Sequence, residues 1–163
     1  MNMTHYMQLL ADNQPWNLLL FMAVPVVLAE TVAITELFVL FRRAGSGALV
    51  RINRAASIAG GGYFVLVFGY LLTTAVVPLT RSGGWRGPAD VIAVGAYLAG
   101  VVPLVGMALL DLRWIGARLT DEQRMGWHAG CVAVFLVVAH VAMIFGMLDP
   151  TLLGGAPDPH AGH

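Results

Sequence analysis

The chain has few charged residues for its length. Asp, Glu, Lys and Arg make up only 11% of its 163 residues, whereas a soluble domain carries about 25%. Hydrophobic residues make up 58% of the chain, and the mean hydropathy is +0.77. A chain with so few charged side chains cannot cover its surface with groups that water solvates, which excludes a soluble domain. The composition therefore predicts a protein whose outer surface faces the lipid bilayer.

The sequence also lacks lysine, net charge and a second cysteine. All nine basic residues are arginine, and nine acidic residues balance them. Without a basic excess there is no field to attract nucleic acid, so nucleic-acid binding is excluded. Cys131 has no partner for an internal disulfide, and its apolar surroundings favour a packing role.

Four apolar stretches are long enough to cross a bilayer, because about 20 helical residues span a hydrocarbon core of about 30 Å. Stretches of this length exclude the short alternating strands of a barrel. We therefore predict an all-α integral membrane four-helix bundle with helices at about residues 15–41, 55–79, 88–110 and 127–148. Pro88 and Asp90 are typical of a helix start, whereas Pro78 and Pro103 should bend or end their helices locally.

Two segments flank the bundle. Residues 1–14 form an N-terminal interfacial segment, in which Tyr6, Met7 and Leu10 have the spacing of a short helix lying on the outer membrane surface. Residues 149–163 are rich in Gly and Pro and are expected to form a flexible tail.

Arginine is distributed unequally between the connections, which predicts how the chain is oriented. Two connections hold seven arginines (42, 43, 51, 54, 113, 118 and 124), whereas the middle connection holds only Arg81 and Arg86. Because basic loops stay in the cytoplasm, both termini should lie on the outer, periplasmic side.

Three ionisable residues within the predicted spans indicate a site. Glu30, Glu36 and His140 each cost at least about 2.5 to 3.5 kcal/mol to place in hydrocarbon, so each should face the bundle interior. Glu30 and His140 share a level near the midplane when residues are counted inward from the membrane boundaries. They could form a structural pair, share a proton, or bind one metal ion.

Methionines near His140 suggest what such a site would bind. Met143 and Met147 follow His140 along one helical stripe, and His5 lies on the same outer side. Thioether and imidazole ligands suit copper, and His with Met is also an axial pair for haem b. We predict a transition metal or haem site at His140 and Glu30, with Met143, Met147 and His5 as secondary ligands. The alternative is that these methionines only fill the core.

A second, weaker site is predicted at the inner end from Glu36, Asp111 and His128, which have similar depths. Ordinary salt bridges at the membrane interface explain the same residues. Glu36 is turned by about 120° from Glu30 around the helix, so it needs its own partner, and Tyr63 is a candidate.

Four stretches carry a resemblance to a known group of proteins. They are Asn13–Asn17, Ala29–Glu36, Gly83–Asp90 and His140–Pro150. Together they resemble a family of small bacterial four-span membrane proteins that are labelled permease-like and have no established activity. The resemblance implies location in the bacterial inner membrane and supplies no catalytic residue.

These observations leave three functional hypotheses. The first is a redox-active metal or haem protein for electron transfer or metal handling. The second is a proton-coupled small permease acting as an oligomer, in which the intramembrane carboxylates take up and release protons. The third is an accessory subunit of a larger membrane complex. No nucleophile triad, phosphate loop or cysteine pair indicates an enzyme class.

Overall fold

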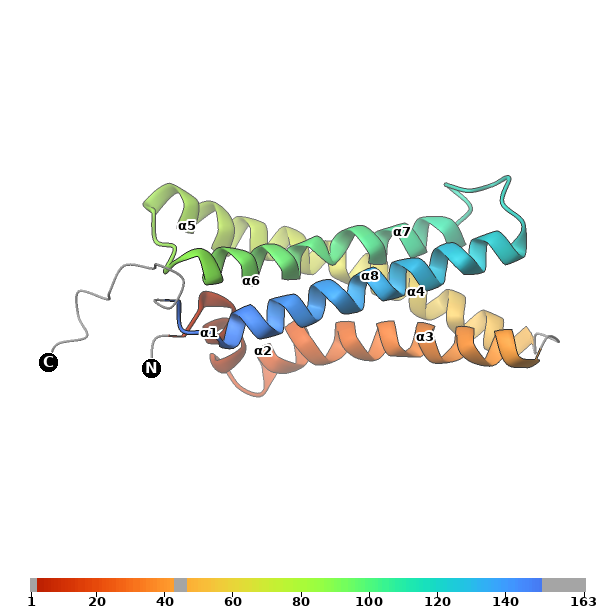
Figure 1. Cartoon of the computed structure of the whole chain (residues 1–163), viewed down its shortest axis with the longest axis horizontal. Coiled ribbons are helices and arrows are strands. Elements are labelled where there is room, and N and C mark those ends of the chain that lie inside the picture. The colour runs from red at the N-terminus through yellow and green to blue at the C-terminus, as the bar shows by residue number, and fades with distance from the viewer. Residues whose placement is uncertain (1–2, 43–46, 151–163) are drawn as a thin grey trace, which may run out of the picture.

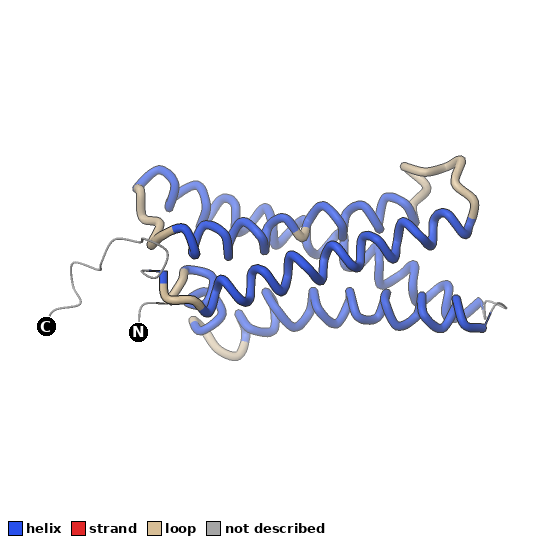
Figure 2. Tube along the Cα trace, viewed as in Figure 1, coloured by secondary structure: helices blue, strands red, loops and turns tan. Residues whose placement is uncertain are grey.

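The computed structural model describes residues 3–42 and 47–150, which contain helices and no strand (Figures 1 and 2). Four helical stretches in this part of the chain are long and apolar enough to cross a membrane: Trp16–Val39, Gly47–Ser82, Pro88–Asp111 and Asp121–Met147. They run side by side along one axis, and the described chain begins and finishes at the same end of the bundle (Figure 1). The predicted fold class, an all-α bundle of four membrane-spanning helices, is confirmed.

The first two spans each contain a wide, π-helical turn. The first span consists of α2 (Trp16–Leu18), the π-helix η1 (Leu19–Ala23) and α3 (Val24–Arg42), and the second of α4 (Gly47–Leu71), the π-helix η2 (Leu72–Val76) and α5 (Val77–Ser82). A proline follows each π-helix by two residues, at Pro25 and Pro78. Proline lacks the N–H that an α-helix needs, and its ring clashes with the carbonyl four residues earlier, so a wider turn relieves both conflicts. Pro78 therefore distorts its helix locally, as predicted.

The third span is divided into α6 (Pro88–Ala99) and α7 (Val101–Asp111). It begins at Pro88 with Asp90 in its first turn, as the sequence predicts. The break at Gly100 lies three residues before Pro103, which interrupts the regular hydrogen bonds there. A Cβ on Gly100 would lie 3.3 Å from the Phe135 ring, so glycine lets that ring approach the break closely.

Two helices extend beyond their apolar stretches at the end where α3 and α7 finish. The fourth span, α8 (Asp121–Met147), begins six residues before the predicted boundary, and α4 begins at Gly47. Thr120 and Gln123 form a capping box that fixes the start of α8. Hydropathy marks the part of a helix that suits hydrocarbon, whereas hydrogen bonding and caps decide where the helix itself begins.

A short N-terminal helix, α1 (His5–Ala11), closes the opposite end of the bundle, and Thr4 caps it. Tyr6 and Leu10 are buried against the bundle, and the Thr4 hydroxyl donates a 2.7 Å hydrogen bond to the Gly146 carbonyl of α8. Burial raises the pKa of Tyr6 to about 12. The predicted short helix is present. It packs against the end of the bundle, and its buried apolar side chains, Tyr6 and Leu10, contact protein where the sequence suggested contact with the membrane surface.

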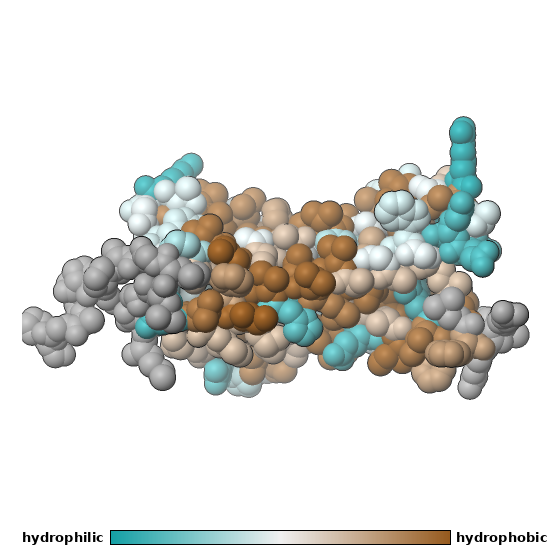
Figure 3. All heavy atoms as spheres, in the orientation of Figure 1, coloured by the Kyte–Doolittle hydropathy of each residue, from teal (hydrophilic) through white to brown (hydrophobic). Residues whose placement is uncertain are grey.

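Aromatic rings fill the bundle core. Phe64 of α4 lies 5.3 Å from the Tyr97 ring and 6.1 Å from the Phe135 ring, measured between centroids. Tyr97 in turn lies 5.3 Å from Tyr6 of α1. α4 packs against α3 and α7, whereas α8 packs against α6 and α7 and meets α3 less extensively. The surface between the two ends is mainly hydrophobic, with a few hydrophilic side chains partway along it (Figure 3).

Candidate functional site

Three ionisable side chains from three helices meet near the end of the bundle opposite α1. The Nδ1 atom of His128 in α8 lies 2.8 Å from Oε1 of Glu36 in α3. Its Nε2 atom lies 3.4 Å from Oδ1 of Asp111, the last residue of α7. The side chains of His128, Glu36 and Asp111 are 4%, 9% and 12% exposed. We call this group the carboxylate–histidine cluster.

The fold brings these residues together because of their positions relative to the helix ends. Glu36 lies shortly before the end of α3, and His128 lies shortly after the start of α8. α3 and α8 run in opposite directions, so these two residues occupy a similar level, which α7 also reaches at its last residue (Figure 1). The structure therefore brings together Glu36, Asp111 and His128, and the site predicted from them stays a prediction.

The cluster is suited to holding a proton. A neutral imidazole has one donor and one acceptor nitrogen, so only the doubly protonated ring can donate toward carboxylates on both sides. Two buried polar atoms at this end, Oδ2 of Asp111 and Nε of Arg124, have no hydrogen-bond partner among the described residues, and the 3.4 Å contact of His128 Nε2 with Asp111 is long for a hydrogen bond. Buried polar atoms of this kind are normally paired with protein or water. The cluster therefore has free capacity for a polar molecule.

A cavity of about 400 Å³ adjoins the cluster. Its lining includes Glu36, Asp111, His128 and three arginines, Arg54, Arg113 and Arg124. Asn53, also in the lining, donates hydrogen bonds of 3.1 and 2.9 Å to the Val32 carbonyl and the Thr35 hydroxyl, which connects α4 to α3.

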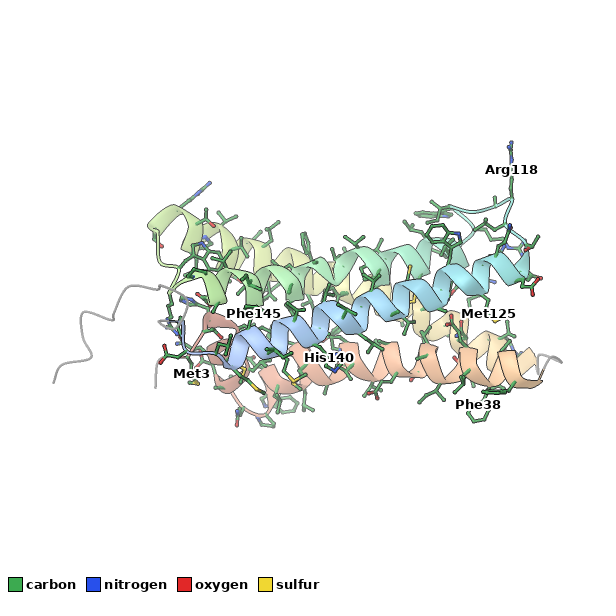
Figure 4. The ribbon with its side chains drawn as sticks, in the orientation of Figure 1. Met3, Phe38, Arg118, Met125, His140 and Phe145 are labelled. Atoms are coloured by element: carbon green, nitrogen blue, oxygen red, sulfur yellow. The ribbon has the colours of Figure 1, made fainter. Side chains whose placement is uncertain are left out.

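The same end carries Arg51, Arg54, Arg113, Arg118 and Arg124, and we call it the arginine-rich end. Arg118 projects from it, away from the helices (Figure 4). The cavity therefore lies at the end that holds most of the arginines, and three carboxylates, Glu36, Asp111 and Asp121, also line it.

The opposite end has its own polar group, built on α1. His5 Nδ1 lies 2.5 Å from Oδ2 of Asp90, which is fully buried. Asp90 also accepts hydrogen bonds from the backbone N–H groups of His5, at 2.7 Å, and Arg86, at 3.2 Å. The Arg86 guanidinium donates to the Met3 carbonyl and, at 2.5 Å, to the Gln8 side chain. This group holds α1 against α6.

The structure corrects the predicted pairing of Glu30 and His140. Both side chains are exposed, and His140 Nδ1 lies 2.6 Å from the Leu136 carbonyl of its own helix. Within residues 3–42 and 47–150, no hydrogen bond or ion pair joins Glu30 to His140. Glu30 is six residues from Glu36 and His140 is twelve from His128, so each is turned by about 120° from the residue that faces inward. The prediction that Glu30 and His140 face the interior is wrong.

The other predicted ligands are dispersed. Met143 is half-buried beside a cavity of about 40 Å³, Met147 is 67% exposed, and His5 is bound to Asp90. Tyr63 donates to the Leu20 carbonyl at 2.8 Å and is not the partner of Glu36.

The described residues hold no group of three or more His, Cys, Asp or Glu side chains arranged around one metal position. In the carboxylate–histidine cluster, Glu36 and Asp111 lie on opposite ring nitrogens of His128, so one ion could not take a ligand from all three. The predicted copper or haem b centre stays a prediction. Most of the predicted flexible tail, residues 151–163, lies outside the described residues.

Sequence reasoning missed Asn53 as a cavity residue and counted Arg124 only among the arginines of a connection. Arg124 lies three residues after the start of α8. The spacing of Arg124 and His128, four residues apart on one helix, places both on the same face and was the available signal.

Comparison with known proteins identifies the family. The model of a family of unknown function, DUF6803, matches residues 1–161, and the chain belongs to this family. No curated protein matches the chain. No solved structure matches it either.

Proposed function

We propose that this member of DUF6803 is a small proton-coupled permease in which the carboxylate–histidine cluster is the proton site and the adjoining cavity binds a polar solute. The observation that carries the proposal is the buried contact of His128 with Glu36 and Asp111 at the cavity wall. Ionisable residues inside a membrane bundle are costly and typically mark ion or substrate pathways. Apolar side chains of similar size would often stabilise the bundle as well or better, so stability alone does not account for the cluster.

The unpaired atoms of the site indicate the chemistry of the solute. The Nε–H of Arg124, which lacks a partner, and the Nε2 atom of His128, which Asp111 contacts only at 3.4 Å, suit a hydrogen-bond acceptor such as a carboxylate or phosphate oxygen, and Oδ2 of Asp111 suits a donor. A small anionic solute that also carries a donor group fits these atoms. By competing with Asp111 for Nε2 of the imidazolium, such a solute would couple its binding to proton transfer.

A cavity lies at each end of the bundle. The one beside the cluster is at the arginine-rich end, and another of about 380 Å³ lies at the α1 end. The rings of Phe135, Phe64, Tyr97 and Tyr6 fill the core between them. The π-helices η1 and η2 and the break at Gly100 are interruptions of regular α-helix in three of the four spans. We propose these interruptions as the places where the spans move to connect the two ends.

We further propose that the protein resides in the bacterial inner membrane with the arginine-rich end in the cytoplasm and both termini outside. The excess of arginine in the two connections at that end supports this orientation. The solute cavity then opens to the cytoplasm.

The test is solute-driven proton movement into proteoliposomes, followed with a trapped pH-sensitive dye and a panel of small carboxylates and phosphates. We expect at least one compound to drive proton flux in the wild type, and His128→Gln to lower that flux at least tenfold. Glu36→Gln should also lower it, because it removes the nearer carboxylate. Glu122→Gln is the matched control, since it neutralises an exposed carboxylate on the same helix outside the cluster and the cavity lining. Equal flux in wild type and His128→Gln would contradict the proposal.

A further inference from the structure

The outer surface of α3 and α8 carries two ionisable residues in the middle part of the spans. Glu30 and His140 are exposed, and His140 lies about halfway along the bundle (Figure 4). Among the described residues, Glu30 has no hydrogen bond or ion pair, and the hydrogen bond of His140 is to a carbonyl of its own helix. An acid and an imidazole facing acyl chains at this depth are costly, so another protein surface is expected to cover them.

Along α8, the exposed residues form a continuous stripe that contains His140. The stripe comprises Gly126, Gly130, Ala133, Val137, His140, Ile144 and Met147, which are spaced alternately by four and three residues. A Cβ added to Gly126 or Gly130 would meet nothing within 4 Å, so the stripe is flat and open at these glycines. Small residues four apart are typical of surfaces where membrane helices approach closely. The stripe supplies room for a second helix beside the exposed imidazole.

We infer that the exposed face of α3 and α8 is the interface for a second copy of this chain, in which Glu30 of each copy pairs with His140 of the other. A twofold interface brings residue i against j and j against i. A patch that contains both an acid and a base is therefore complementary to the same patch on a second copy, and a second copy of this chain is the expected partner.

The heights of the two residues are compatible with this pairing. From the contact between Glu36 and His128, the helical rise places Glu30 about 9 Å and His140 about 18 Å toward the α1 end. Side chains lean toward the N-terminus of their helix. Because α3 and α8 run in opposite directions, Glu30 leans toward the α1 end and His140 leans away from it, so their polar atoms approach a common level.

Cysteine cross-linking in the native membrane tests the surface. In a Cys131→Ser background, Val27→Cys on α3 and Val137→Cys on α8 are 58% and 62% exposed and lie at the same height along the bundle. The proposed pairing places each of them opposite the other residue in the second copy. The matched control replaces Val137→Cys with Leu66→Cys, which is 73% exposed on α4, the helix diagonally across the bundle from α8. We expect mild oxidation to give a disulfide-linked dimer from the chain with Val27→Cys and Val137→Cys, and at least tenfold less from the chain with Val27→Cys and Leu66→Cys. Equal cross-linking of both chains would overturn the proposal.

A charge-exchange experiment tests the pairing itself, with dimer fraction in lipid nanodiscs measured by single-molecule photobleaching. Glu30→His alone and His140→Glu alone each place like residues together and should lower the dimer fraction several-fold. Mixing these two variants, or combining both changes in one chain, restores acid opposite base and should recover the wild-type fraction. A monomeric wild type, or a dimer that none of these changes affects, would overturn the inference. Proton flux can be measured on the same samples, so the outcome is separate from that of the permease proposal.

Discussion

Three consecutive glycines of α4 occupy different environments although they are identical in sequence. A Cβ on Gly61 would lie 2.6 Å from the Ala108 Cβ and 2.9 Å from the Leu104 carbonyl oxygen. A Cβ on Gly62 would meet nothing within 4 Å, and one on Gly60 would make an ordinary 3.6 Å contact with Leu28. Gly61 is therefore the residue that sets the separation of α4 and α7.

We expect Gly61→Ala to lower the free energy of unfolding by about 1–3 kcal/mol, because the added methyl group must push two backbones apart. Gly62→Ala should leave stability unchanged or raise it by up to about 1 kcal/mol, since alanine favours helix more than glycine does. Unfolding in mixed micelles titrated with a denaturing detergent measures both values. Equal effects of the two changes would show that α4 and α7 are not in close contact at Gly61.

The sequence analysis identified the three members of the carboxylate–histidine cluster but treated them as a weaker site than the pair Glu30 and His140. Glu36, Asp111 and His128 have similar depths, which the sequence shows, and the structure joins them. Depth alone also matched Glu30 with His140, because counting residues gives height along a helix and leaves its rotation about its axis open. Only the packing of α3 against α8 determines which of the two glutamates faces inward.

At the scale of elements, α1 is attached to the bundle by polar contacts at its first turn. His5 is bound to the buried Asp90, and the Thr4 hydroxyl is bound to the Gly146 carbonyl. A helix of seven residues is too short to be stable alone in water. Its structure therefore depends on these contacts and on the burial of Tyr6 and Leu10.

Replacing His5 with alanine should release α1, because it removes a 2.5 Å contact and leaves the Asp90 carboxylate buried without its main partner. We expect amide exchange of residues 5–11 to become at least tenfold faster while the centre of α4 is unchanged. Asp12→Ala is the control, since the Asp12 side chain is exposed. Unchanged exchange in His5→Ala would show that the apolar contacts of α1 suffice to hold it.

The number, order and approximate limits of the spans could be predicted because about 20 apolar residues in succession suit a bilayer. The interruptions were harder to place. Pro78 and Pro103 predicted the distortions near them. The π-helix before Pro25 was not predicted, because proline near the start of a span is tolerated in an ordinary helix. Where each distortion lies depends on how neighbouring helices pack.

For the whole molecule, arginine content separates the two ends of the bundle. The arginine-rich end carries the connection after α3 and the loop between α7 and α8, and the α1 end carries the short connection with Arg81 and Arg86. This difference supports the proposed orientation, with the cavity facing the cytoplasm.

Reporter fusions in a bacterial host test the orientation. We expect alkaline phosphatase joined after His163 to be active, because the enzyme folds only in the periplasm, and a fluorescent protein at the same position to be dark. The reverse pattern is expected for fusions within the loop that contains Gly116. An active phosphatase in that loop together with a fluorescent C-terminus would place the arginine-rich end outside.

Each π-helix, Leu19–Ala23 and Leu72–Val76, accommodates one residue more than the α-helical turn it replaces. Removing one amino acid from such a turn and replacing the proline that follows it would restore regular helix and leave both flanking segments facing their present neighbours. The same deletion elsewhere in a span would rotate everything after it by about 100°. These two turns are therefore the positions at which the spans can change length during evolution without losing the contacts that define the bundle.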